Sequence, residues 1–364
     1  MCALFVCLFH FRANGPIATL EFVRGSWLFV DFFFVLSGFV IAANYRERLV
    51  AGAFLRGFVI LRFGRVYPLH LVMLMAFVAM ELVGFVLFSK GLMHRQPFDD
   101  QHSVVAIFTN LTLTQAFGVH DKLTWNHPAW SIAVEFWTYL LFALAARWAG
   151  AALETWLVVA IAFSIGVLMV ATPFGINVTY GWSLFRCVYG FAVGAIAWRW
   201  WQGSGLVPAQ GYRGATMIEM AAVAAVVVFV AMGGAAPVNL LAPLVFGAAV
   251  LVFAREGGMV SRGLLAAPLR TLGVLSYSIY MVHVFVQSRM DDGLRIIGKL
   301  LHVELVTRTV SSAGVRLDVV GATAVQGVVL TLVMLALVVA VSQLTWRFVE
   351  VPGQRLARRW AARG

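Results

Sequence analysis

Long apolar runs, separated by short segments that carry most of the charge, constrain this chain more than any other feature of its sequence. Of its 364 residues, 62% are hydrophobic and only 12% are charged, whereas soluble domains carry about 25% charged residues. So little charge cannot form a water-exposed surface unless lipid covers much of it. About 20 apolar residues cross a bilayer as a helix, and many runs approach that length. The sequence therefore predicts a multi-pass integral membrane protein.

Charges, prolines and glycines bound these runs and predict ten helices. We expect them near residues 1–13, 26–44, 67–89, 128–148, 155–172, 183–201, 216–232, 238–254, 272–290 and 321–346. The predicted fold is all-α, a polytopic membrane helical bundle of about ten transmembrane helices. The first run is too short to span alone, so we expect a truncated first helix. We expect the transmembrane domain over residues 1–352 and a basic cytoplasmic tail over residues 353–364.

The net charge of +11 does not indicate nucleic acid, because the basic residues sit mostly in short loops between apolar runs. Such loops are cytoplasmic in most membrane proteins. Arginines cluster between residues 46 and 65 and after residue 347, whereas the loops near 173–182 and 233–238 carry no Lys or Arg. This alternation predicts that both chain ends face the cytoplasm.

Two ionisable residues lie in the first two apolar runs, where such groups are costly and often functional. His10 stands in LFVCLFHF and could pair with a neighbouring helix or act as a general base, since imidazole titrates near neutrality. Asp31 stands in FVDFFFVLSGFVI and needs a partner. It could orient His10, as carboxylates do for catalytic histidines, or pair with an arginine. Ser37 and Gly38 indicate close helix packing.

Arg62 and Arg65, in LRFGRVYPLH, are three residues apart, so a helix or turn would place both on one face. Positive-inside charge alone could explain them. Paired guanidiniums also match phosphate oxygens bidentately, which suits a phosphate-rich donor that arrives from the cytoplasm. We expect Pro68 to restrain the entry to the next helix.

Polar residues recur inside two later runs. Glu135 follows Ser131 by four residues, on the same helical face, and could serve in catalysis or bridge helices. Ser276, Tyr280 and His283 form one polar stripe, which usually faces a cavity or another helix. The histidines show no HxxxH or HExxH spacing, so we expect no metal site.

Together these segments resemble the acyltransferase 3 family of membrane O-acyltransferases. The matching blocks occur in the family's order across residues 1–352 and so cover nearly the whole chain. They are a first-helix histidine (His10), a D-x-F-F-x-x-S-G-F-type segment (Asp31 to Phe39), R-x-x-R with a following proline (Arg62, Arg65, Pro68), W-S-x-x-x-E (Trp130, Ser131, Glu135), S-Y-S-x-Y-x-x-H (Ser276 to His283) and E-x-P (Glu350 to Pro352).

The resemblance implies about ten helices in the bacterial inner membrane and an O-acyltransferase. Members of the family take acyl groups, commonly acetyl from acetyl-CoA, to hydroxyls of cell-surface or exported carbohydrates. It implies acyl-CoA as a donor substrate and no permanently bound cofactor. In the family, an arginine stands eleven residues before the first-helix histidine. Counting back from His10 falls before Met1, so we expect a native start upstream or a truncated chain.

For the mechanism we expect His10 to act as base on a sugar hydroxyl that attacks the thioester. Asp31 or Glu135 would hold its imidazole, and Arg62 and Arg65 would hold coenzyme A phosphates. A developing oxyanion needs donors placed in advance, and Ser131 and Tyr280 could supply them. An acyl-histidine intermediate fits the same residues as well as direct transfer does.

A function of another class also fits a bundle with buried acids and histidines. In an exporter of a polysaccharide or a lipid-linked sugar, these groups would form a proton path. Transporters often carry internal repeats with broken helices, and the sequence has no such repeat. A non-catalytic membrane scaffold is a third alternative. The enzyme is therefore the favoured prediction.

Overall fold

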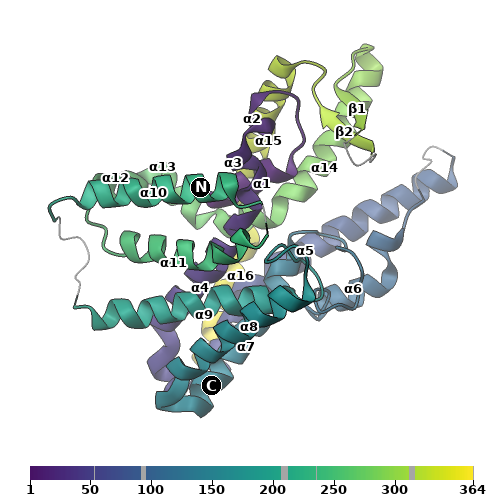
Figure 1. The fold of residues 1–364 in the computed structure, drawn as a ribbon. Helices are drawn as coiled ribbons and strands as arrows, with labels where there is room; N and C mark the ends of the chain where they lie inside the picture. Colours follow the sequence, from purple (N-terminus) through teal and green to yellow (C-terminus); the bar gives the residue numbers. More distant parts are fainter. Residues whose placement is uncertain (53, 92–95, 206–211, 235, 311–315, 364) are drawn as a thin grey trace.

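The computed structural model describes residues 1–52, 54–91, 96–205, 212–234, 236–310 and 316–363 (Figure 1). It is built almost wholly of helices, and one helix lies at each of the ten expected positions. These are α1 (Cys2–His10), α4 (Phe29–Val50), α5 (Leu55–Ser89), α7 (Ala129–Ala149), α8 (Leu153–Ala171), α9 (Ser183–Gly203), α10 (Ala215–Met232), α11 (Ala242–Phe253), α14 (Ser276–Leu301) and α15 (Ala324–Thr345).

Fewer than ten helices are long and apolar enough to cross a membrane alone. Within the described residues five stretches qualify, or up to six if one bent helix pair is counted as a span. One of the five is 43 residues long and contains both α7 and α8. Helix α1 has only nine residues and α11 only twelve, and α9 carries Arg186 within its apolar sequence. These helices support an integral membrane protein, whereas ten independent spans are not confirmed.

Shorter elements connect these helices. They are α2 (Pro16–Thr19), α3 (Glu21–Arg24), η1 (Ser26–Leu28), η2 (Asp100–His102), α6 (Val104–Leu111), η3 (Gly150–Ala152), η4 (Val238–Leu241), α12 (Met259–Leu264), α13 (Ala267–Val274), η5 (Trp346–Glu350) and α16 (Val351–Ala361). Strands β1 (Val306–Val310) and β2 (Arg316–Val320) pair antiparallel and lie beside α14 at one end of the molecule (Figure 1). The sequence did not predict this hairpin, so the all-α expectation needs that small correction.

Helix α5 begins twelve residues before its expected start at residue 67. It runs through Pro68 and is 35 residues long, so Arg62 and Arg65 lie on a regular helix rather than before one. A proline inside a membrane helix is tolerated where neighbouring helices pack on it. Here α16 does so: a Cβ on Gly353 would lie 2.6 Å from the Cγ of Pro68. The expectation that Pro68 marks a helix entry is wrong for this reason.

The helix expected at residues 272–290 is broken. Helices α13 and α14 meet at Leu275 with a bend of 69°, and α14 continues to Leu301. The bend places the first residues of α14, Ser276 and Tyr277, against the interior of the bundle.

Helices α4 and α9 pack more closely than any other pair and hold the middle of the bundle (Figure 1). A Cβ on Gly38 would overlap the backbone carbonyl oxygen of Phe191, and one on Gly194 would overlap that of Val35. Each glycine therefore lets the opposite backbone approach, as small residues do at membrane helix contacts. The close packing expected around Gly38 is present.

The segment expected as a basic tail is helical. Helix α16 packs along α5, where Ala357 contacts Gly64. Helix α16 therefore packs against and supports α5, the helix that carries Arg62 and Arg65.

Candidate active site

A cavity of about 250 Å³ lies between α4, α5, α7 and α14. Its wall includes seven of the residues named from the sequence, namely Ser37, Arg62, Arg65, Ser131, Glu135, Ser276 and Tyr280. They come from four helices, so the fold brings together residues that lie more than 200 positions apart in the sequence.

Of the two arginines that line the cavity, Arg62 has the charge that is less compensated by an acidic partner. Its Nη2 donates to the hydroxyl of Tyr45 at 3.0 Å, and its guanidinium lies over the Tyr45 ring, 5.0 Å from the centroid. Its Nε is buried, and no residue in the described part of the chain accepts a hydrogen bond from it. An anion with several acceptor oxygens would satisfy that donor.

Arg65, one turn further along α5, is held by an acidic partner. It forms an ion pair with Glu350, which is almost completely buried and also accepts from Ser278 at 2.9 Å. Glu350 is the first residue of the E-x-P block of the sequence, and its contacts join α5, α14 and η5. Arg65 is therefore well positioned, but part of its charge is compensated.

Glu135 bridges two helices, which is one of the two alternatives that its sequence context left open. It accepts hydrogen bonds from Ser37 on α4 and from Tyr139 on α7, the latter at 2.5 Å. Among the described residues it makes no hydrogen bond to His10, so the structure gives no support to Glu135 as the residue that orients that imidazole.

Asp31 is paired with Arg186 on α9 instead of with His10. The carboxylate accepts two hydrogen bonds from the guanidinium, at 2.9 and 2.7 Å, and both side chains are almost completely buried. Arg186 also lies between the faces of Trp27 and Trp130, 5.1 and 5.2 Å from their centroids. Among the described residues Asp31 makes no hydrogen bond to His10, so the structure gives no support to Asp31 as the residue that orients that imidazole. The alternative pairing with an arginine is the one the structure contains.

His10, at the end of α1, lies against His283 of α14. The Nε2 of His283 is 3.3 Å from the Nδ1 of His10, and the ring centroids are 5.0 Å apart. His283 is fully buried, whereas His10 is exposed. Two histidines 273 positions apart therefore form one pair, with only His10 open to a second substrate.

Backbone carbonyls fix the tautomers of both rings. Nδ1 of His283 lies 2.7 Å from the carbonyl oxygen of Tyr280, and Nδ1 of His10 lies 2.9 Å from that of Val6. A carbonyl oxygen only accepts, so each Nδ1 carries a proton. Nε2 of His283 then has a free lone pair 3.3 Å from Nδ1 of His10, so the single Nδ1 proton of His10 is shared between that nitrogen and the carbonyl oxygen of Val6. This arrangement leaves the lone pair of His10 on Nε2, where a base needs it.

Tyr280 lies at the arginine-lined cavity and beside the histidine pair. Its hydroxyl accepts a hydrogen bond from Ser131 at 2.8 Å, and its ring lies 5.9 Å from that of His283. The same residue lines the cavity. Tyr280 thus contacts both halves of the site.

His127, just before α7, is a third histidine in this region that the sequence did not single out. Burial, together with the positive charge that His10 can carry, lowers the pKa of His127 to about 4, so it is neutral at physiological pH. No group of three His, Cys, Asp or Glu side chains within the described ranges could hold a metal ion.

Sequence reasoning also missed Arg186, Tyr139 and Ser37 as members of the site region. Arg186 could have been found, because it is an ionisable residue within an apolar run, as Asp31 is. Tyr139 stands four residues after Glu135, the spacing of a helical contact. Ser37 was assigned only to close packing.

The described residues thus place a histidine pair and an arginine-lined cavity in one apolar helical bundle. Comparison with known proteins identifies the family: residues 1–347 match the acyltransferase 3 family, described as an acyltransferase domain. The chain belongs to this family and is an enzyme of the class that transfers acyl groups other than amino-acyl groups.

Two relatives show the extent of the likeness. The chain is 36% identical over 157 residues to "Protein 2 in picA locus" of Rhizobium radiobacter, which covers 40% of this chain and 78% of that protein. It is 31% identical over 140 residues to "Acyltransferase MdmB" of Streptomyces mycarofaciens, which covers 38% of this chain and 30% of that protein. No solved structure matches the chain significantly.

Proposed function

We propose that the protein is an O-acyltransferase of the bacterial inner membrane, with both chain ends in the cytoplasm. It moves an acetyl group from acetyl-CoA to a hydroxyl of a cell-surface or exported carbohydrate. The observation that supports the proposal is that Tyr280 lines the same cavity as Arg62 and that its ring lies 5.9 Å from that of His283, the partner of the exposed His10. The donor then binds on the arginine side and the acceptor on the histidine side.

The donor's phosphates bind Arg62 and Arg65 in this proposal. Guanidiniums suit phosphate because their N–H groups match its oxygens in pairs. Arg62 has an unused buried donor, while Arg65 is held in place by Glu350. We therefore expect Arg62 to contribute more to donor affinity than Arg65.

The histidine pair supplies the base. Nε2 of His10 takes the proton of the acceptor hydroxyl, and its oxygen attacks the thioester carbonyl carbon. His283 accepts the Nδ1 proton of His10 and stabilises the imidazolium, in the position that a carboxylate occupies in other enzymes. The carbon–sulfur bond then breaks, and the coenzyme A thiolate takes the proton from His10. If His10 attacks first, the same atoms give an acyl-histidine, followed by transfer to the hydroxyl.

The test is transfer of radiolabelled acetyl from acetyl-CoA in membranes that contain the full chain. We expect label in the carbohydrate fraction, and a loss of roughly 100-fold or more for His10→Ala. His302→Asn is the matched control, since His302 is exposed at the end of α14 in the left-handed conformation that Asn also adopts, and its loss should leave the rate unchanged. Equal labelling by wild type and His10→Ala would remove His10 from the mechanism. Label confined to lipid or protein would contradict the carbohydrate acceptor.

A further inference from the structure

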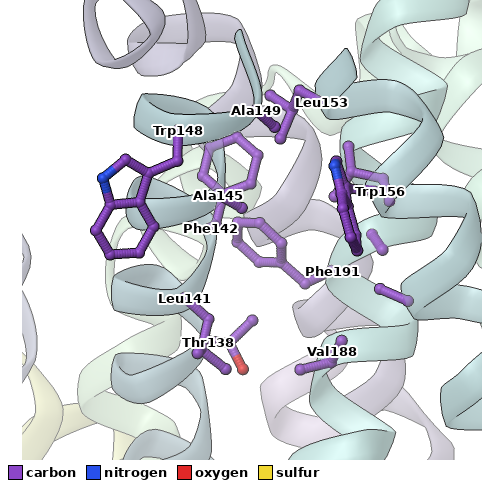
Figure 2. Close-up of a pocket in the computed structure, with 13 residues that line it drawn as sticks. Thr138, Leu141, Phe142, Ala145, Trp148, Ala149, Leu153, Trp156, Val188 and Phe191 are labelled. Atoms are coloured by element: carbon purple, nitrogen blue, oxygen red, sulfur yellow. The ribbon is translucent and has the colours of Figure 1, made fainter. Parts of the chain in front are cut away.

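A second and larger cavity lies outside the site described above. It is a groove of about 520 Å³ between α7, α8 and α9, a volume typical of sites for small molecules. Figure 2 shows Trp148 and Trp156 on its two sides, with Phe142 and Phe191 between them. Trp148 is 77% exposed and Trp156 is 60% exposed, so the groove opens on the surface of the bundle.

The lining of this groove suits only an apolar occupant. Apart from the two indoles, Thr138 is the one lining residue with a polar side chain, and its hydroxyl already donates to the carbonyl oxygen of Val134 at 2.8 Å. Among the described residues, the wall of this groove contains no charged side chain.

The groove is separated from the arginine-lined cavity by packed rings. Phe191 lies between Phe142 and Tyr139, with centroid distances of 5.1 and 6.0 Å. Phe142 and Phe191 line the groove, whereas Tyr139 lines the arginine-lined cavity. An acyl chain that begins at Arg62 would have to displace these rings to enter the groove.

One end of the groove carries excess positive charge. Arg199 lies seven residues after Ala192, about two turns along the same face of α9. Glu154, next to Leu153 of the groove wall, pairs with both Arg46 and Arg199. Two guanidiniums share one carboxylate, and the side chain of Arg199 remains 52% exposed. Tryptophans and arginines together mark the level of lipid headgroups.

We propose that this groove binds an acyl chain of an anionic phospholipid, whose phosphate lies on Arg199. The apolar wall accepts the chain, the exposed indoles lie at the headgroup level, and the unbalanced guanidinium selects the negative headgroup. The site does not depend on the acyl-transfer proposal, because it shares no residue with the arginine-lined cavity or the histidine pair.

The test uses the full chain in phosphatidylcholine nanodiscs that contain a small fraction of phosphatidylglycerol brominated on one acyl chain. Bromine quenches tryptophan fluorescence on contact. Subtracting the signal of a Trp148→Phe, Trp156→Phe double variant isolates the two indoles of the groove. We expect saturable quenching, with half-saturation at a mole fraction about fivefold lower than for brominated phosphatidylcholine, the preference that one nearby arginine provides.

Three single variants locate the effect. Arg199→Gln should abolish the preference for phosphatidylglycerol, and Ala145→Phe, which fills the groove, should reduce the quenching. Val158→Phe adds the same ring on an exposed part of α8 outside the groove and should change neither.

Three results would overturn the proposal. The first is quenching that rises linearly and equally with both lipids, which indicates only bulk bilayer. The second is quenching that Ala145→Phe leaves unchanged. The third is relief of quenching by palmitoyl-CoA and not by acetyl-CoA, which would assign the groove to the chain of a long acyl donor.

Discussion

The buried pair of Asp31 and Arg186 provides the sharpest test of how this bundle is held together. Two hydrogen bonds of 2.9 and 2.7 Å join the side chains, and both are almost completely buried. Removing one partner of such a pair leaves a buried charge without compensation, which costs about 3–5 kcal/mol. We therefore expect Asp31→Leu to lower the free energy of unfolding by that amount.

Arg186→Met should be destabilising as well, since it leaves the Asp31 carboxylate without its two donors. The double variant removes both charges together, and we expect it to be no less stable than either single variant. The interaction energy in this double-mutant cycle should then be at least as large as the larger single effect, about 3–5 kcal/mol. After Asp31→Leu, Arg186 keeps only the carbonyl oxygen of Val178 and the faces of two tryptophans.

The assay is reversible unfolding in mixed micelles of a mild detergent and SDS, followed by circular dichroism, with acetyl transfer measured on the same preparations. If Asp31 is structural, the double variant retains most of its activity. The reasoning is refuted if the two single effects simply add, or if Asp31→Leu keeps full stability and yet abolishes transfer. The latter result would return Asp31 to the catalytic role that its sequence context also allowed.

Three further predictions concern other parts of the molecule. Gly38→Ala should prevent correct packing of α4 on α9, seen as loss of the monodisperse peak in size-exclusion chromatography, whereas Gly166→Ala, with open space around it, should not. Arg62→Lys should raise the KM for acetyl-CoA about tenfold with little change in kcat, because a point charge cannot replace a bidentate donor; an unchanged KM would contradict donor binding there. His283→Phe should lower kcat by roughly 100-fold, with partial rescue in His283→Gln, whose amide oxygen can still accept the proton; equal rates for these two variants would refute the accepting role.

The sequence predicted the membrane class and the positions of ten helices because apolar runs bounded by charge leave few alternatives. It failed where packing overrides a local signal. Pro68 looked like a boundary, but Gly353 on α16 lets the chain pack against its ring and α5 continues through it. The break at Leu275 has no proline or glycine at the bend itself, so no local residue announced it.

Sequence reasoning could not establish which residues of the site contact one another. Asp31 had to have a partner, but Arg186 lies 155 residues away and no spacing links the two. His10 and His283 stood out separately for the same chemical reason, and only the fold reveals that they form a pair. An ionisable residue within an apolar run indicates a position with a structural or functional role. Which partner that residue contacts depends on how the helices pack.

The hydrogen-bonded pair of Tyr280 and Ser131 has a consequence for how much of the bound donor is lost to hydrolysis. A thioester is hydrolysed when water reaches it beside a base, so a donor waiting in an open site would be wasted. The buried ring of Tyr280 lines the arginine-lined cavity and packs beside His283, which leaves little room there for water beside a bound donor. The hydrogen bond from the Ser131 hydroxyl keeps this ring in place, so we expect it to favour transfer of the acyl group over hydrolysis.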